Sequence, residues 1–180
     1  MFDRLIDFLI EFVELFRVFV FVREFEEGVV LRQGKFHRTL GPGFHRIIPA
    51  GQEELIVLNV KPEPLYLDIQ SLHTSDEYPL NIQVGLIWHI TDIKKFLIDN
   101  DNTPSIIGML CSGVVTRSVQ ATKWKELRVD GYPGTLRAPM NRKVRKKLGA
   151  EIDEVVIQDF VCGSADRLWH EGISLTLGED

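Results

Sequence analysis

Residues 26–49 read EEGVVLRQGKFHRTLGPGFHRIIP and place four glycines between short β-branched and aromatic runs. This spacing is typical of consecutive turns in a β-meander. Gln33-Gly34 lies between two apolar runs, and glycine supplies the positive φ that a tight hairpin requires. Gly41-Pro42-Gly43 predicts a second turn, followed by a short strand that Pro49 ends. The stretch therefore predicts three short antiparallel strands, with structural turns at Gly28, Gly34, Gly41, Pro42, Gly43 and Pro49.

The composition of the chain is that of a folded protein with an acidic balance. Its 180 residues are 26% charged and 44% hydrophobic, and the net charge is -5. This length suits one domain with a real core, and the negative charge argues against nucleic acid as the main partner. Cys111 and Cys162 are isolated, which favours a reducing compartment without a disulfide framework. The histidines show no ligand spacing, so we expect neither a metal nor a cofactor.

Residues 1–22 are rich in apolar side chains, but charges interrupt the run. They therefore fit neither a membrane-spanning helix nor a secretory signal. Placed on a helix, the six charges of residues 1–17 fall within one arc of roughly 140°, which predicts an amphipathic helix. Beyond Arg17 this pattern fails, and VFVFV at 18–22 favours a strand or a buried joint. The residues expected to contact a membrane are Phe2, Leu5, Ile6, Leu9, Phe12, Val13, Phe16 and Phe19.

Two interpretations of this helix stay open. Its wide apolar face suits a helix that lies in the bilayer interface without crossing it. Its polar face, however, carries four acids against two bases, whereas helices that bind anionic membranes are usually basic. The alternative is that the apolar face packs on the domain or on a neighbouring subunit.

The middle of the chain predicts strands followed by helices. Residues 53–60 and 65–69 are expected to be short strands, and the prolines between them mark a sheet edge or a break. Residues 80–91 alternate apolar and other side chains over twelve positions, which predicts a strand with one buried face. His89 falls on the other face, where we expect it to be solvated. Asn102-Thr103-Pro104 predicts the start of a helix in which Cys111 is a core residue rather than a nucleophile.

A basic helix is predicted from about residue 134 to 148, with Gly149 as its carboxy-terminal cap. Its narrow apolar stripe consists of Leu136, Met140, Val144 and Leu148, and most of its other residues are basic. A last strand is expected at 151–160. The motifs contain no acid pair, catalytic triad, phosphate loop or metal cluster, so we expect no catalytic residue and no enzyme.

The string at 28–49 resembles the opening of the SPFH or Band 7 domain of stomatins, prohibitins and flotillins. The resemblance rests on Gly28, on Gly34-Lys35-Phe36 and on Pro42-Gly43-Phe44-His45, and weaker matches continue to about Phe160. It implies an α+β fold, with a curved antiparallel sheet followed by packed helices and a returning strand. The expected parts are an N-terminal amphipathic anchor at 1–22, the SPFH/Band 7-like domain at 23–162 and a short tail at 163–180.

The resemblance also implies a non-catalytic scaffold on the cytoplasmic side of a membrane that assembles into rings or arcs and organises a membrane patch or partner proteins. Expected partners are membrane lipid, further copies of the chain, and another membrane protein or a protease. The alternative is a soluble regulatory module, for example a protease regulator, whose N-terminal helix docks on a partner.

Family members usually continue into a long heptad helix, whereas the 20 residues after Phe160 are broken by glycine and too short for three heptads. We therefore expect oligomerisation through the domain itself, with bases of one copy meeting acids of the next. The expected contact residues are Arg137, Arg142, Lys143, Arg145, Lys146, Glu151, Asp153 and Glu154. The acidic face of the N-terminal helix is the alternative to the last three.

Overall fold

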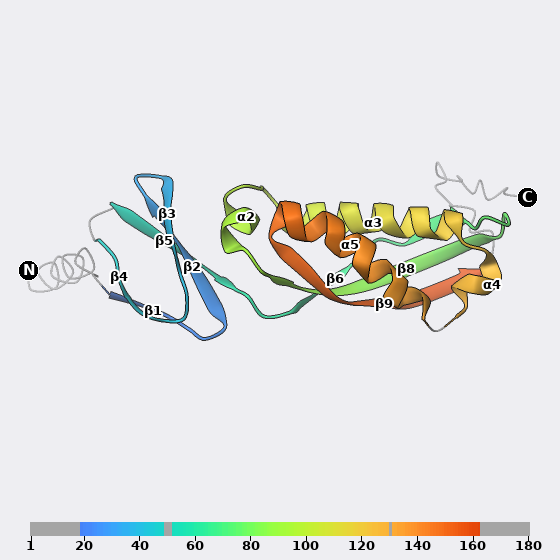
Figure 1. Ribbon diagram of the computed structural model, residues 1–180, viewed down its shortest axis with the longest axis horizontal. Coiled ribbons are helices and arrows are strands. Elements are labelled where there is room, and N and C mark those ends of the chain that lie inside the picture. The colour runs from blue at the N-terminus through green and yellow to red at the C-terminus, as the bar shows by residue number, and fades with distance from the viewer. Residues whose placement is uncertain (1–18, 49–51, 130, 163–180) are drawn as a thin grey trace, which may run out of the picture.

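The computed structural model describes residues 19–48, 52–129 and 131–162, which form an elongated molecule of two lobes (Figure 1). The amino-terminal lobe is built from strands alone: β1 (Phe19–Val22), β2 (Glu26–Arg32), β3 (Lys35–Leu40), β4 (Gly43–Arg46) and β5 (Glu53–Asn59). The carboxy-terminal lobe combines a sheet with helices. Antiparallel strands followed by helices and a final strand confirm the predicted α+β class.

In the amino-terminal lobe, β2 is central and pairs with β3 on one side and β5 on the other. The hairpin between β2 and β3 turns at Gln33-Gly34, where Gly34 has a φ of 74° as predicted. The expected third strand, β4, does not pair with β3. It pairs with β1 in a separate two-stranded ribbon, so the prediction of a simple meander was wrong. Residues 41–42 lead the chain from β3 into β4, where Gly43 has a φ of 132°.

Gly28 was predicted to lie in a turn, but it lies inside β2 opposite Leu40 and Val57. A side chain here would bring its Cβ within 2.8 Å of Leu55 Cδ1. The role of Gly28 is therefore close packing against the side chain of Leu55, rather than a turn. Pro49, the last of the predicted turn residues, lies outside the described residues.

The sheet of the carboxy-terminal lobe is organised around β8 (Pro79–Ile90). One side of β8 pairs with β9 (Ala150–Cys162) along almost its whole length. The other side pairs first with β7 (Gln70–His73) and then with β6 (Glu63–Tyr66), which together form an interrupted edge. The strand expected at 65–69 is β6 at Glu63–Tyr66, and Pro64 lies within this edge strand instead of preceding it, which fits the edge rather than the break that the prolines were expected to mark. The sequence did not predict β7, because its four residues include only one large apolar side chain.

Helices cover one face of this sheet (Figure 1). They are α2 (Ile93–Leu97), α3 (Thr103–Ala121), α4 (Trp124–Leu127) and α5 (Tyr132–Leu148). The alternating apolar residues of β8 from Leu80 to Trp88 are buried in the core that the sheet forms with α3 and α5. The four residues of the α5 stripe are buried in the same core, which confirms both patterns. Cys111 is fully buried in this core, and burial raises the pKa of its thiol to about 12, so the thiol is unreactive at neutral pH.

His89 is not simply solvated as expected. Its Nδ1 lies 2.8 Å from Asp153 Oδ2 on the adjacent strand β9, and both side chains are about one-third exposed. No local pattern indicated this pair, because the two residues are 64 positions apart.

Gly149 ends α5 in the left-handed conformation, with a φ of 63°. A Cβ at this position would lie 2.3 Å from the carbonyl oxygen of Asp92. Gly149→Ala should therefore lower the free energy of unfolding by more than about 2 kcal/mol, because the clash adds to a conformational penalty of roughly 1–2 kcal/mol. Urea denaturation measures the loss.

Gly134→Ala is the matched control, since Gly134 lies within α5 and no atom lies within 4 Å of the position that a Cβ would occupy there. It should be neutral or stabilise the protein by up to about 1 kcal/mol. Equal effects of the two substitutions would show that the close approach at Gly149 is unimportant.

Candidate membrane-facing site

The ribbon of β1 and β4 carries three exposed phenylalanines on its outer side. Phe19, Phe21 and Phe44 are 55%, 69% and 69% exposed, and Phe21 is the cross-strand partner of Phe44. The rings of Phe19 and Phe44 stack with their centroids 5.1 Å apart. We call these three residues the aromatic face. A contiguous apolar surface of this kind indicates a binding surface rather than ordinary solvent contact.

The inner side of the same ribbon packs on the lobe, so the phenylalanines face outward. Val20 and Val22 alternate with the phenylalanines and pack against Val30, Leu40 and Leu55 in the core of the lobe. Because successive side chains of a strand point to opposite sides, the sequence FVFV is apolar on both. The domain covers the valine side of the ribbon, whereas the phenylalanine side stays exposed. The ribbon lies at the end of the molecule furthest from α3 and α5 (Figure 1).

A buried carboxylate at the start of β5 connects the end of β4 to the rest of the lobe. The side chain of Glu53 is 1% exposed, and its Oε1 accepts hydrogen bonds from Arg32 Nε and Nη2 at 3.2 and 2.7 Å. Its Oε2 accepts the backbone N–H of Ile48, just beyond β4, at 2.8 Å. Arg38 and His37 of β3 lie 3.6 and 3.7 Å from the carboxylate. We call this set the Glu53 cluster, and it joins β2, β3 and β5 to the end of β4.

Arg38 strengthens this connection, because its Nη2 also donates to the carbonyl oxygen of Arg46, the last residue of β4. The hydrogen bond from Ile48 and those from Arg32 hold the pKa of the Glu53 carboxyl below its ordinary value. Glu53 is therefore ionised at neutral pH, and the ionised form is the one that holds β4, and with it Phe44, against the lobe.

Seven of the eight residues predicted to contact a membrane, at positions 2–16, lie outside the described residues. The eighth, Phe19, is in β1, which belongs to the folded domain rather than to the preceding segment. The predicted change of state after Arg17 fits the observed strand. Sequence reasoning missed Phe21 and Phe44 as candidates. The alternation of FVFV was visible, but its pairing with β4, which brings Phe44 beside it, was not.

Four of the residues expected at a contact between copies are engaged within the chain. Arg145 lies 3.1 Å from Glu151, and Asp153 binds His89. Arg137 Nε donates to the carbonyl oxygen of Ile152 at 3.1 Å. The remaining four make no ion pair with any described residue, and they are Arg142, Lys143, Lys146 and Glu154.

Two other kinds of site are absent from the described residues. No three His, Cys, Asp or Glu side chains in the described ranges come together as they would around a metal ion. None of the helices within those ranges is long and apolar enough to cross a membrane.

The family model of the SPFH domain / Band 7 family matches residues 20–160, which is most of the chain. The chain therefore belongs to this family, whose members are generally membrane-associated, scaffold-like proteins and are generally not enzymes. A search of curated proteins found no match. The matched region begins within β1 and so includes Phe21 and Phe44 of the aromatic face.

Glu53→Gln should lower the melting temperature at pH 7, because the neutral amide leaves Arg32 and Arg38 without their carboxylate. The wild-type contribution is present above the pKa of an unfolded Glu, roughly 4.3, and is lost as the pH falls through the lower folded value. The difference between the two proteins should therefore shrink in acid. Thermal denaturation from pH 7 to about pH 3 measures it.

The control for this substitution is Glu54→Gln, which removes an exposed charge at the next position. It should leave the melting temperature nearly unchanged. A Glu53→Gln protein that melts like the wild type at pH 7 would contradict the role given to the cluster.

Proposed function

We propose that this protein is a non-catalytic scaffold that attaches to the cytoplasmic side of a membrane without crossing it, and that assembles into rings or arcs. The observation that carries the proposal is the aromatic face. It lies at one end of an elongated domain. Its strand β1 directly follows residues 1–18, whose predicted amphipathic helix would enter the same membrane surface.

The energetic support comes from apolar area. A fully buried phenylalanine side chain contributes on the order of 1.5–3 kcal/mol, and each ring of the aromatic face leaves more than half of its surface exposed. Electrostatic attraction has a smaller role, since each base near an anionic surface contributes roughly 1 kcal/mol that salt reduces. Attachment should therefore persist at high salt.

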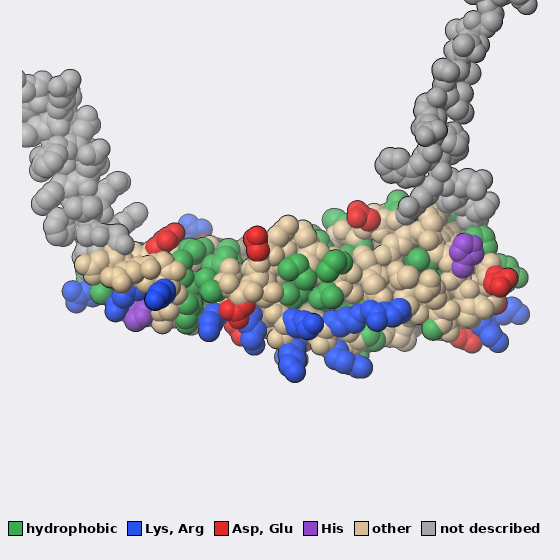
Figure 2. Space-filling model, turned by 90° about the horizontal axis from the view of Figure 1, so that it is seen from above, with side chains coloured by type: hydrophobic (Ala, Val, Ile, Leu, Met, Phe, Trp, Pro, Cys, Tyr) green, Lys and Arg blue, Asp and Glu red, His purple; other side chains and the backbone are tan. Residues whose placement is uncertain are grey.

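Assembly is proposed to use the opposite lobe. Lys and Arg side chains form a row along the part of the molecule that carries the helices (Figure 2). Arg142 and Lys146 are exposed on α5 and line a shallow hollow with Ala138 and Asn141. A contact between unlike patches of successive copies generates rings or open arcs. Because exposed ion pairs are weak, these bases would set the register of a contact that also buries apolar surface.

Replacing both Phe21 and Phe44 with serine should reduce the fraction of protein that floats with phosphatidylcholine vesicles by at least about tenfold at equal lipid concentration. A loss of about 1.4 kcal/mol is enough for that factor. The reduction should be the same at low and high salt, because the contact is apolar. Flotation of the full chain through a density gradient measures it.

A variant with Tyr66→Ser and Tyr78→Ser is the control, since it removes two exposed aromatic rings from the other lobe. It should float like the wild type. If the Phe21 and Phe44 variant also floated like the wild type, the aromatic face would not contact the membrane. Release of the wild type by salt alone would contradict an apolar contact.

Charge reversal of Arg142 and Lys146 to glutamate should reduce the size of the assembly without unfolding the subunit. Neither residue has an ion pair among the described residues, so the change leaves the Arg145–Glu151 pair of the subunit intact. Negative-stain microscopy and mass photometry in detergent measure the size. Particles of unchanged size, together with an unchanged melting curve, would show that these bases do not contribute to assembly.

A further inference from the structure

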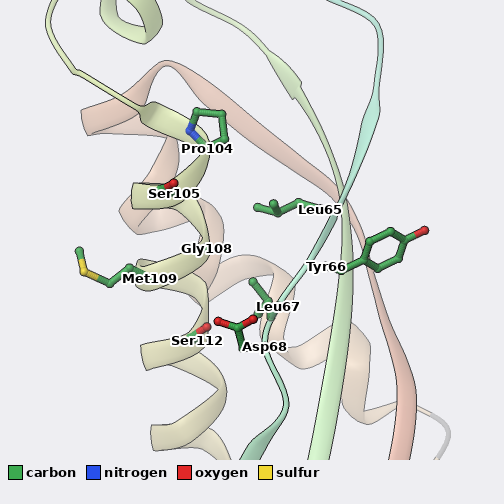
Figure 3. A pocket seen from close by; sticks show the side chains of 9 residues that line it. All are labelled: Leu65, Tyr66, Leu67, Asp68, Pro104, Ser105, Gly108, Met109 and Ser112. Carbon is green, nitrogen blue, oxygen red and sulfur yellow. The ribbon is translucent and has the colours of Figure 1, made fainter.

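A groove of about 400 Å³ lies between the edge strand β6 and helix α3 (Figure 3). On the strand side, Leu65 and Leu67 project toward the helix, whereas Tyr66 points away from it. On the helix side, the groove is lined by Ser105, Gly108 and Ser112, which are small. The small residues leave room between the strand and the helix. The leucines give the lining apolar surface, and the Asp68 carboxylate also points toward α3 beside Ser112 (Figure 3).

The outer edge of β6 keeps unused backbone groups beside this groove. The N–H of Leu67 donates to the carbonyl oxygen of Val84 on β8 at 2.9 Å. Because alternate residues of an antiparallel strand face the partner, the backbone groups of Pro64 and Tyr66 face outward. The N–H of Asp68 bonds to no backbone acceptor in the described ranges. Pro64 has no N–H, so no backbone donor is left unpaired at its position on the sheet edge.

At the opposite edge of the sheet, on β9, a side chain satisfies the outward backbone groups of one residue. The side-chain amide of Asn141 on α5 accepts the N–H of Ile152 on β9 at 2.7 Å and donates to the carbonyl oxygen of Ile152 at 2.9 Å. It thereby supplies the two hydrogen bonds that another strand would make at Ile152. The side-chain hydrogen bonds of α3 within the described residues go to other groups, and none reaches the backbone of Tyr66 on β6.

The chain contains a segment that fits the groove. Residues 172–178 read GISLTLG, in which three apolar residues alternate with Ser174 and Thr176 between two glycines. Strict alternation bounded by glycine predicts a short strand. Its length suits a single edge strand such as β6 or β7, which have four residues each.

The segment can also reach the groove. The last residue of β9, Cys162, pairs with Leu80, which pairs on its other side with Leu72 of β7. From there to the position beyond β6, opposite Leu86, is about 20 Å along the sheet and about 14 Å across three strand spacings. Ten extended residues span up to roughly 33 Å, so residues 163–172 are long enough.

We propose that residues 173–177 bind in this groove of the same chain as an additional strand on β6. Backbone hydrogen bonds to Tyr66 and Asp68 would give affinity, as in other cases where a peptide adds to a sheet edge. The apolar residues of the segment would cover the partly exposed Leu65 and contact the small residues of α3. This closes the second edge of the sheet and is independent of membrane attachment.

Disulfide trapping tests the proposal in the full chain. Ser105→Cys is combined with cysteine at Ile173, Leu175 or Leu177 in turn, in a Cys162→Ser background. Cys111 stays, because it is fully buried and its raised pKa keeps it unreactive. Mild oxidation of dilute protein should link at least one of these pairs within a single chain, and mass spectrometry identifies the linked peptides.

The control places the helix cysteine at Gln120, which is exposed on α3 but outside the groove. It should yield about tenfold less linked product. Equal yields from Ser105 and Gln120 would overturn the proposal. A disulfide that joins two chains, without the product within one chain, would contradict the assignment of the segment to its own groove.

Hydrogen exchange provides a readout that needs no new cysteine. Deletion of residues 172–180 should increase the exchange of the Tyr66 and Asp68 amides about tenfold or more, while the Val155 amide of β9 keeps its rate. Unchanged exchange at Tyr66 and Asp68 would overturn the proposal.

Discussion

A carboxylate that is removed from water needs partners, and Glu53 finds them on several different strands. Arg32 faces it across the ladder from β2, Arg38 and His37 approach from β3, and the N–H of Ile48 reaches it from the end of β4. Strand β4 makes no ladder with the central sheet of this lobe, so these contacts and that of Arg38 with Arg46 hold it in place. Removal of Glu53 would leave Arg32 and Arg38 without their carboxylate and would free the N–H of Ile48, so this residue contributes to the placement of β4.

The consequences extend to the proposed function. A ribbon of only four residues a strand is too small to be stable alone, so it must be held on both its strands. β1 is held by Val20 and Val22 in the core, and β4 by the Glu53 cluster. With its inner side fixed, the ribbon presents Phe19, Phe21 and Phe44 on a rigid support. The helical lobe, with its exposed bases, remains at the other end of the molecule and can contact further copies (Figure 2).

Local patterns predicted much of the fold because each depends on residues close in the sequence. The alternation at 80–90, the stripe at 136–148 and the cap at Gly149 all lie where expected. The aromatic face and the Glu53 cluster depend on pairing between distant segments. No local signal indicated that β4 would join β1, or that Glu53 would point inward beside Arg32, 21 positions away. The position of Gly28 inside a strand could not be predicted locally either, since it depends on the side chain of Leu55 on a neighbouring strand.

If the aromatic face enters the membrane as proposed, a spin label attached to it lies within the lipid. A nitroxide attached to cysteine at position 44, in a Cys162→Ser background, is compared on vesicles with one at Val129, which is exposed in the other lobe. For each label, relaxation by oxygen, which concentrates in lipid, is compared with relaxation by a nickel chelate, which stays in water. The label at position 44 should be relaxed mainly by oxygen and the label at position 129 mainly by nickel. Equal access of nickel to both labels on membrane-bound protein would contradict the proposal.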